Sequence, residues 1–215
     1  MKNNSCVVID YGLGNTFSVI NALKIIGAEP ILTNDPKKIE NAERIILPGV
    51  GAFGNGIEKL KKLKIIDSLS NYILKEKPLL GICLGMQLLM ETSYEFGKFE
   101  GLGYIKGEVK KIKIKDNNSK FIKVPLIGWY KTKVYDSYLS STSKSLVESI
   151  NLKSFYYVHS YSVLPVKKKN VLAYVEHANQ RIVAAICEEN IIGVQFHPER
   201  SGKFGLGFIE NFMNL

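Results

Sequence analysis

The stretch Leu79-Leu80-Gly81-Ile82-Cys83-Leu84-Gly85-Met86-Gln87 decides the fold. Residues 79–83 form an apolar run typical of a buried strand, and residues 84–92 carry apolar side chains at helical spacing. A strand that runs directly into a helix, with one reactive side chain at the junction, has the form of a nucleophile elbow. Gly81 and Gly85 make the sharp turn feasible, because side chains two positions from its apex would collide with the neighbouring backbone.

Cys83 is the apex residue of this turn and the candidate nucleophile. We expect its side chain to be presented to solvent at the start of the helix, where the helix dipole favours a thiolate over a thiol. The alternative is that Cys83 is a small buried apolar residue, as most free cysteines are. The pentapeptide alone leaves both interpretations open.

The chain on either side of this junction predicts an α/β fold. In the first half, β-branched runs alternate with amphipathic stretches, which is typical of a largely parallel sheet covered by helices. Strands are expected over residues 6–10, 30–32 and 45–47, the first helix over 16–26, and a turn at Pro48-Gly49-Val50-Gly51. The 215 residues suit one domain, 1–215.

From Gly101 onward the sequence changes to shorter alternating strands that extend and cover the same sheet. These strands are expected over residues 109–114, 156–158, 171–175, 182–187 and 191–196. A turn is predicted at 116–119, a loop at 136–145 and a closing helix at 204–212.

Composition excludes several classes of protein. No apolar run approaches the roughly 18 residues of a membrane span, and the start of the chain lacks the layout of a secretory signal, which favours a cytoplasmic protein. The three cysteines have neither metal-ligand nor disulfide-framework spacing. The net charge of +9 raises nucleic acid as a partner, but the lysines are scattered and lack interleaved aromatic residues, so surface lysine is the preferred interpretation.

A cysteine nucleophile needs a base, and the chain has three histidines. His197 follows the strand 191–196, and Glu199 lies two residues on, where it can orient the imidazole. His159 also lies near a strand end but has no carboxylate close in sequence, and His177 has the character of a surface residue. Acyl transfer further requires donors for an oxyanion: the peptide N–H of Leu84 is one, and the Pro48–Gly51 segment is the candidate for the other.

The stretch 81–87 together with Gln195-Phe196-His197-Pro198-Glu199 resembles the class I, triad-type glutamine amidotransferases. More narrowly, the chain resembles the glutaminase subunits of imidazole glycerol phosphate synthases over essentially its whole length. Further matching segments are residues 10–15, 47–53, 128–129 and 156–161. The resemblance implies an open, flavodoxin-like three-layer α/β sheet with the active site at the strand ends.

The resemblance also implies roles for individual residues. Cys83, His197 and Glu199 match the catalytic triad, and the peptides of Val50 and Leu84 match the oxyanion donors, of which the first often has to reorient. Residues that match glutamine-binding positions or lie on a strand lining that pocket are Gly51, Gln87, Ser160 and Tyr161. Residues that match the face docking on a (β/α)8-barrel synthase subunit are Asn15, Trp129 and Tyr156, with Arg200 where the family usually has Lys.

Two departures concern this docking face. The family pattern Pro-His-Met-Gly-Trp-Asn is replaced by Pro125-Leu126-Ile127-Gly128-Trp129-Tyr130, so that a His and an Asn of the docking face are lost. Arg200 keeps the charge of Lys but changes its reach and hydrogen-bond geometry. The altered residues raise the alternative of a paralogous subunit that serves amidination of surface sugars in place of histidine synthesis.

The implied reaction is hydrolysis of glutamine through a Cys83 thioester, needing neither metal nor organic cofactor. Ammonia would pass to the barrel partner in a heterodimer, and in histidine synthesis its acceptor is a phosphoribulosyl aminoimidazole nucleotide. Two further classes stay open. One is a cysteine peptidase or amidase with the same elbow, and the other is a catalytically silent subunit that binds glutamine or serves as a scaffold.

Overall fold

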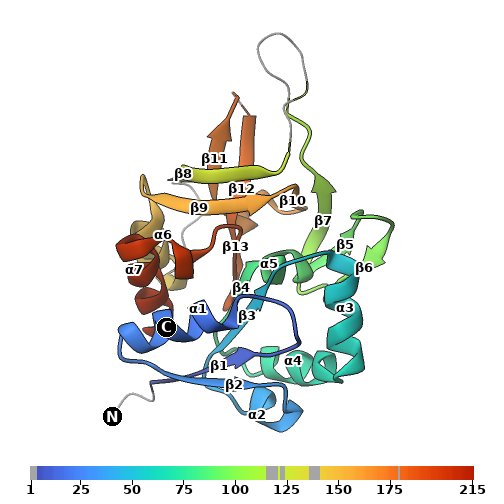
Figure 1. Cartoon of the computed structure of the whole chain (residues 1–215), viewed down its shortest axis with the longest axis vertical. Helices are drawn as coiled ribbons and strands as arrows, with labels where there is room; N and C mark the ends of the chain where they lie inside the picture. Colours follow the sequence, from blue (N-terminus) through green and yellow to red (C-terminus); the bar gives the residue numbers. More distant parts are fainter. Residues whose placement is uncertain (1–3, 115–120, 122–123, 136–140, 179) are drawn as a thin grey trace.

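The computed structural model describes residues 4–114, 121, 124–135, 141–178 and 180–215. Its centre is a nine-stranded sheet in the order β2-β1-β3-β4-β13-β12-β11-β8-β9 (Figure 1). A smaller four-stranded sheet has the order β10-β7-β5-β6. The strands of the large sheet are β1 (Ser5–Ile9), β2 (Glu29–Thr33), β3 (Ile45–Gly49), β4 (Leu79–Cys83), β8 (Leu126–Val134), β9 (Ser154–His159), β11 (Val171–His177), β12 (Gln180–Glu188) and β13 (Ile191–Val194).

The five strands β2, β1, β3, β4 and β13 run parallel, and the remaining four are antiparallel to their neighbours. The strand β4 lies between β3 and β13, so the nucleophile elbow is flanked on both sides by strands running in the same direction. Because the carboxyl ends of parallel strands meet at one edge of a sheet, residues that follow β3, β4 and β13 are brought together there.

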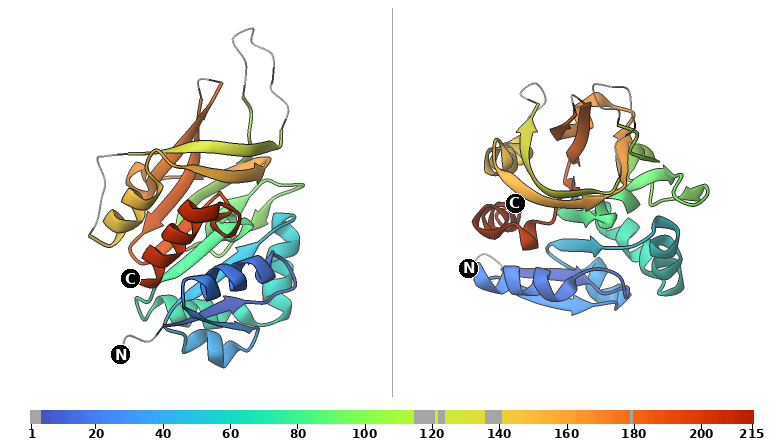
Figure 2. Two further views of the ribbon diagram at one scale, coloured as in Figure 1. Left: turned by 60° about the vertical axis from the view of Figure 1, so that its left-hand side comes forward. Right: turned by 45° about the horizontal axis from the view of Figure 1, so that its top comes forward.

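Helices lie on both faces of the parallel part of the large sheet, which gives three layers there (Figure 2). Alternate residues of β1 show this: Cys6 and Val8 belong to one apolar cluster with Val19 and Phe208, whereas Val7 and Ile9 belong to another. On the first side α1 (Thr16–Ile25) and α6 (Ser141–Ile150) pack against α7 (Gly202–Met213). On the second side α2 (Pro36–Glu40) and α3 (Phe53–Lys62) pack against α4 (Ile65–Ile73), and α3 contacts α5 (Leu84–Leu88).

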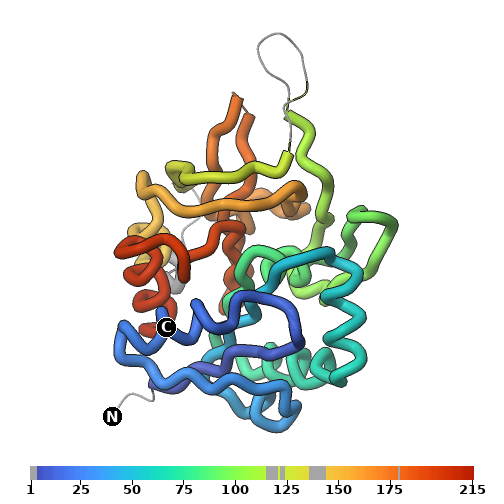
Figure 3. The backbone as a smooth tube through the Cα atoms, viewed as in Figure 1, coloured from blue at the N-terminus to red at the C-terminus, as the bar shows by residue number. Residues whose placement is uncertain are grey.

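The backbone path brings the last helix back to the first, so that α7 lies beside α1 (Figure 3). The short helix η2 (Pro198–Arg200), which contains Glu199, also contacts α1. None of the helices in the described part of the chain is long and apolar enough to cross a membrane.

Several predicted boundaries are wrong. The helix expected over 84–92 ends at Leu88, and Met90–Ser93 form β5, because this segment pairs with β6 (Phe99–Glu100) and β7 (Ile105–Lys111). The turn expected at 48–51 begins later, since Pro48 and Gly49 still pair with Ile82 and Cys83. Pro48 fits in the strand because β1 pairs with β3 only through Ile45 and Ile46, so that its missing N–H is not needed.

The second half also differs from the expectation. The strands β7 and β10 (Tyr161–Pro165) belong to the small sheet and do not extend the large one. The loop expected over 136–145 is wrong from Ser141 onward, where α6 begins, since its apolar residues Leu146, Val147 and Ile150 pack into the core. Residues 136–140 and the turn predicted at 116–119 lie outside the described residues.

Candidate active site

Cys83 is the last residue of β4 and immediately precedes α5. Its backbone has φ 55° and ψ −108°, a strained combination for a residue with a side chain. A Cβ on Gly81 would lie 2.8 Å from backbone atoms of Gly85, and a Cβ on Gly85 would overlap the carbonyl oxygen of Leu47. The turn therefore requires glycine at both positions, as the sequence predicted.

The environment of Cys83 differs from the expectation in one respect. Its side chain is not presented openly to solvent, because only 7% of the residue is exposed. In addition, α5 is a helix of only five residues, so its dipole is weaker than that of the longer predicted helix. The helix therefore contributes less to the surroundings of the sulfur than the sequence predicted.

His197 follows β13 and lies beside Cys83, and Glu199 lies behind His197 in the short helix η2. The Nδ1 atom of His197 is 2.8 Å from Oε1 of Glu199, and both side chains are almost completely buried. Ser201 fixes the backbone around them, since its hydroxyl donates to the carbonyl of His197 at 2.6 Å and accepts the N–H of Tyr156 at 3.0 Å. The imidazole is thus held with its Nε2 free of hydrogen-bond partners among the described residues.

The charge state of His197 follows from these neighbours. Burial alone lowers the pKa of His197, but interactions with the sulfur of Cys83 and with Glu199 outweigh burial and raise the pKa to about 10. The sulfur is near enough to act on the imidazole electrostatically, although no hydrogen bond of normal geometry joins the two groups. At neutral pH His197 therefore carries the proton that a departing amine would need.

We expect the Glu199→Gln substitution to lower the pKa of His197, because a neutral amide no longer favours the imidazolium. Imidazole NMR signals recorded against pH would measure the change. The folded-state pKa of about 10 lies above the ordinary 6.5, so the stability contributed by protonated His197 is complete below about pH 6.5 and is lost as the pH rises toward 10. An unchanged titration in Glu199→Gln would show that the carboxylate does not set the charge of the imidazole.

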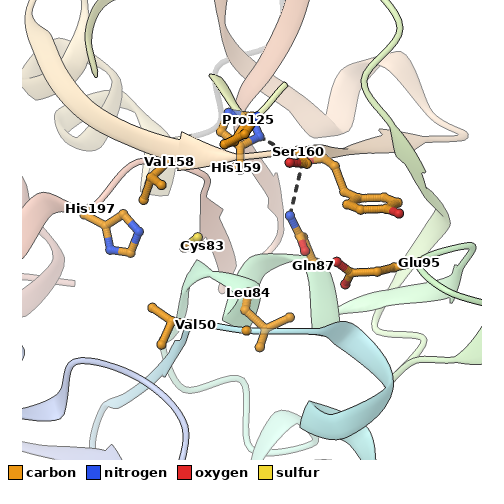
Figure 4. A pocket seen from close by; sticks show the side chains of 12 residues that line it. Val50, Cys83, Leu84, Gln87, Glu95, Pro125, Val158, His159, Ser160 and His197 are labelled. Atoms are coloured by element: carbon orange, nitrogen blue, oxygen red, sulfur yellow. Dashed lines mark hydrogen bonds between the residues drawn. The ribbon is translucent and has the colours of Figure 1, made fainter. Parts of the chain in front are cut away.

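A pocket of about 280 Å³ opens over these residues. Figure 4 shows it with His197 on one side of Cys83 and with Gln87 and Glu95 on the other. The predicted site residues that line it are Val50, Gly51, Cys83, Leu84, Gln87, Ser160, Tyr161 and His197. Glu199 lies behind His197 and does not reach the pocket. The structure thus brings together every residue predicted for the triad, the oxyanion and the substrate.

His159 lines the same pocket but differs from His197 in its electrostatics. Burial lowers the pKa of His159 to about 4, so that its imidazole is neutral. Its Nδ1 is 2.8 Å from the carbonyl oxygen of Tyr161, and a neutral ring in this position must donate from Nδ1. Among the residues described, no carboxylate hydrogen-bonds to His159, so His197 stays the predicted base.

The segment predicted to supply the second oxyanion donor lies next to the nucleophile. Gly49 pairs in register with Cys83, and Val50 is the next residue. A Cβ on Gly49 would lie 2.5 Å from the hydroxyl of Tyr11 and 2.9 Å from the Cβ of Leu84, so only glycine allows so close an approach. Gly51 has φ +106°, a conformation that favours glycine, and open space around its Cα.

Glu95 lines the pocket but is not among the site residues predicted from the sequence. Its Oε2 accepts the N–H of Phe53 at 2.7 Å, and burial raises the pKa of its carboxyl group. Glu95 follows β5 in a polar segment with no motif around it. Only the pairing of β5 with β6 and β7 brings it to the pocket, and no signal in the sequence indicated that pairing.

Three of the predicted docking residues form one cluster. The Trp129 ring meets the Tyr156 ring edge-on at a centroid distance of 6.1 Å, and the Arg200 guanidinium lies 4.8 Å from the Tyr156 centroid. Trp129 is 58% exposed. Asn15 caps α1 by accepting the N–H of Ser18 at 3.3 Å, and α1 contacts the helix that contains Arg200.

The two altered positions near Trp129 do not share its face of β8. Residues of this strand alternate, with Ile127 and Trp129 exposed, whereas Leu126 is buried. The Tyr130 ring packs inward against Tyr157 at 5.9 Å. The expectation that the loss of the family's His alters the docking face is therefore wrong, because the side chain of Leu126 lies in the core.

This fold and site correspond to a known family. The model of the class-I glutamine amidotransferases matches residues 7–214, and the chain belongs to this family. The predicted family membership is thus confirmed. More narrowly, the chain is 45% identical over 207 residues to imidazole glycerol phosphate synthase subunit HisH 2 of Methanococcus maripaludis, covering 96% of this chain and 97% of the relative. The subunit HisH of Aquifex aeolicus is 40% identical over 208 residues, with coverages of 96% and 94%.

Solved structures agree on the fold. The structure of PurLQS from Thermotoga maritima has a TM-score of 0.70 at 21% identity, with coverages of 98% of this chain and 97% of that chain. A crystal structure described as a glutamine amidotransferase has a TM-score of 0.72 at 16% identity, with coverages of 97% and 99%. These similarities confirm the predicted α/β fold class.

Proposed function

We propose that this chain is the glutamine-hydrolysing subunit that supplies ammonia to an imidazole glycerol phosphate synthase in histidine biosynthesis. The observation that carries the proposal is the arrangement of Cys83 at a strained elbow, His197 with a raised pKa beside it, and Glu199 at 2.8 Å from that imidazole. The names of relatives at 37–45% identity over nearly the full chain support the pathway.

In the proposed reaction the thiolate of Cys83 attacks the carboxamide carbon of glutamine. Protonated His197 gives its proton to the amide nitrogen, the C–N bond breaks, ammonia leaves, and a glutamyl thioester remains. Water then loses a proton to His197 and attacks the carbonyl carbon of the thioester. The C–S bond breaks, which releases glutamate and regenerates the Cys83 thiolate. Peptide N–H groups of Val50 and Leu84 stabilise the tetrahedral oxyanion in both steps.

The pocket chemistry fits an amino-acid substrate. The two N–H groups of Gln87 Nε2 are occupied by the carbonyl of Tyr161 at 3.2 Å and by Gln195 at 3.1 Å. The carbonyl oxygen of Gln87 and the carboxylate of Glu95 remain as acceptors lining the pocket, where they can receive an α-ammonium group. Gly51, Ser160 and Tyr161 complete the proposed substrate site.

Assaying the purified chain on free glutamine and on a panel of glutamine-containing peptides tests this function. We expect glutamate and ammonia from free glutamine and no cleavage of the peptides, because a pocket of about 280 Å³ accommodates a single amino acid. Preference for peptides would replace the amidotransferase with a cysteine peptidase. Binding of glutamine without turnover, even with a partner present, would favour the catalytically silent subunit.

We further propose that the face around Trp129, Tyr156, Arg200 and Asn15 docks on a (β/α)8-barrel synthase subunit. The exposed aromatic and guanidinium groups are of the kinds enriched at protein interfaces. This face is directly connected to the proposed active site, because the main-chain carbonyl of Tyr156 accepts the N–H of His197 at 2.9 Å. Leu126 replaces the His of the family pattern, but its side chain is buried. This replacement therefore does not support a partner from a surface-sugar pathway.

We expect the isolated chain to hydrolyse glutamine slowly and the barrel partner with bound acceptor to raise the rate by about 10²–10³-fold, the contribution of one oxyanion donor. The reason is that the peptide between Gly49 and Val50 is bordered by a second glycine and can be reoriented by docking. Steady-state assays with and without partner measure the effect. Equal rates would show a preformed oxyanion site, and activation only by a sugar-modifying partner would change the pathway.

We propose that residues 1–215 form a single glutamine amidotransferase domain. We also propose that the protein is located in the cytoplasm. The three cysteines are all free and buried, as in proteins of a reducing compartment.

A further inference from the structure

Gln195 is a completely buried polar residue between the buried apolar residues Val194 and Phe196. It belongs to the segment that precedes the triad histidine, yet neither the proposed mechanism nor the substrate site uses it. Its Nε2 lies 3.5 Å from the sulfur of Cys83, and its Oε1 lies 3.1 Å from Nε2 of Gln87. A buried amide is costly unless its polar atoms are paired, so these contacts call for a functional explanation.

The direction of these hydrogen bonds can be deduced from one unambiguous acceptor. The main-chain carbonyl of Tyr161 can only accept, so the end of Gln87 that lies 3.2 Å from it must be the NH₂ group. The second N–H of that group points to Gln195 at 3.1 Å, and the atom that receives it must be the carbonyl oxygen. The opposite end of the Gln195 amide is then the NH₂ group, and it faces the sulfur of Cys83.

We propose that Gln195 is a positioning residue that donates an N–H to Cys83 Sγ and holds the sulfur in its reactive, anionic form. A thiolate accepts hydrogen bonds more strongly than a thiol, so a donor fixed at 3.5 Å favours the nucleophilic form and restricts its rotamer. The short helix α5 contributes only a weak dipole, which leaves room for a side-chain donor. This inference rests on the proposed function of Cys83 as nucleophile.

The chain of hydrogen bonds also connects the nucleophile to the substrate site. Gln87 lines the pocket and is fixed by Tyr161 and Gln195 together. Gln195 therefore has two separable effects: its N–H acts on the sulfur, and its carbonyl oxygen orients Gln87. Loss of the N–H donated to the sulfur should lower kcat, whereas loss of the carbonyl oxygen that orients Gln87 should raise KM.

Two variants separate these effects. Gln195→Glu keeps an oxygen for Gln87 but presents a carboxylate in place of the N–H to the sulfur, whereas Gln195→Met keeps the approximate volume and removes both contacts. Thr132→Val is the matched control, because Thr132 is also completely buried and its hydroxyl bonds Tyr157 at 2.8 Å, away from the pocket. Thermal unfolding of each variant reports whether the fold is kept.

Alkylation of Cys83 by iodoacetamide at neutral pH, followed by peptide mass spectrometry, gives a readout that needs neither glutamine nor partner. Cys6 and Cys187 provide internal references, since burial raises the pKa of each thiol to about 12. We expect both Gln195 variants to be alkylated about 10- to 100-fold more slowly than wild type, the usual effect of a hydrogen bond to a charged group. In Gln195→Glu, the rate relative to wild type should recover as the pH falls, because a protonated carboxyl can again donate.

The second measurement is the steady-state kinetics of glutamine hydrolysis by this chain together with its synthase partner. We expect both variants to lose kcat by a similar factor, with KM raised in Gln195→Met and close to wild type in Gln195→Glu, while Thr132→Val leaves alkylation and kcat unchanged. Alkylation within twofold of wild type in a folded Gln195→Glu would overturn the proposal. Equal slowing in Thr132→Val would also overturn it, since loss of any buried hydrogen bond would then suffice. If wild type failed to hydrolyse glutamine, the proposed function would fall, while alkylation would still decide whether Gln195 acts on the sulfur.

Discussion

Replacement of Cys83 by Ala is expected to lower glutamine hydrolysis by about 10⁴-fold or more, because removal of the attacking atom abolishes the thioester route. The fold should persist, since Ala keeps the Cβ of the elbow and adds no atom beside Gly81 and Gly85. Release of glutamate from glutamine, measured with the barrel partner present, gives the rate, and circular dichroism checks the fold.

Cys187→Ala is a suitable control for this experiment. Cys187 is a free, buried cysteine like Cys83, but it does not line the pocket. We expect this variant to retain wild-type activity. Substantial hydrolysis by Cys83→Ala would show that the sulfur is not the nucleophile and would remove the basis of the proposed function.

The second large effect is expected from His197→Ala, which should lower the rate by about 10²–10⁴-fold, the usual contribution of a general acid and base. His197 has the two features that this role requires: a proton retained at neutral pH, with a pKa of about 10, and an orienting carboxylate at 2.8 Å. Steady-state kcat/KM for glutamine measures the loss.

His159→Ala is the matched comparison, because His159 is also buried and lines the same pocket. Its pKa of about 4 leaves it without a proton to give at neutral pH, so we expect a much smaller loss that falls mainly on KM. A larger loss for His159→Ala than for His197→Ala would reverse the assignment of the base.

Some structural features were predictable because they depend on local backbone geometry and on neighbours along the chain. The strand 79–83 and its turn at Cys83 follow from an apolar run and two glycines, and the structure reproduces this strand with the predicted bounds. Glu199 could be paired with His197 because it lies only two positions further along the chain, so that a single turn of η2 brings the carboxylate to the ring.

Other features depend on which strands pair in the folded protein. The sequence-based prediction was wrong where the local sequence pattern indicated one secondary structure and strand pairing produced another. The helical apolar spacing continues to Thr92, but pairing with β6 and β7 makes Met90–Ser93 the strand β5, and that pairing brings Glu95 to the pocket. Pro48 and Gly49 look like a turn in sequence, but they continue β3 because Ile82 and Cys83 lie beside them. The burial of Leu126 likewise follows from the side of β8 that faces the core.

The sequence by itself thus determined the elbow, the candidate nucleophile and base, and the family, because these features are encoded by residues close together in the chain. Only the tertiary structure decided what surrounds the sulfur. Gln195 is 112 residues from Cys83 and 108 from Gln87, and no local pattern relates them. They come together because β13 pairs with β4 in parallel and in register, which brings the end of one strand beside the end of the other.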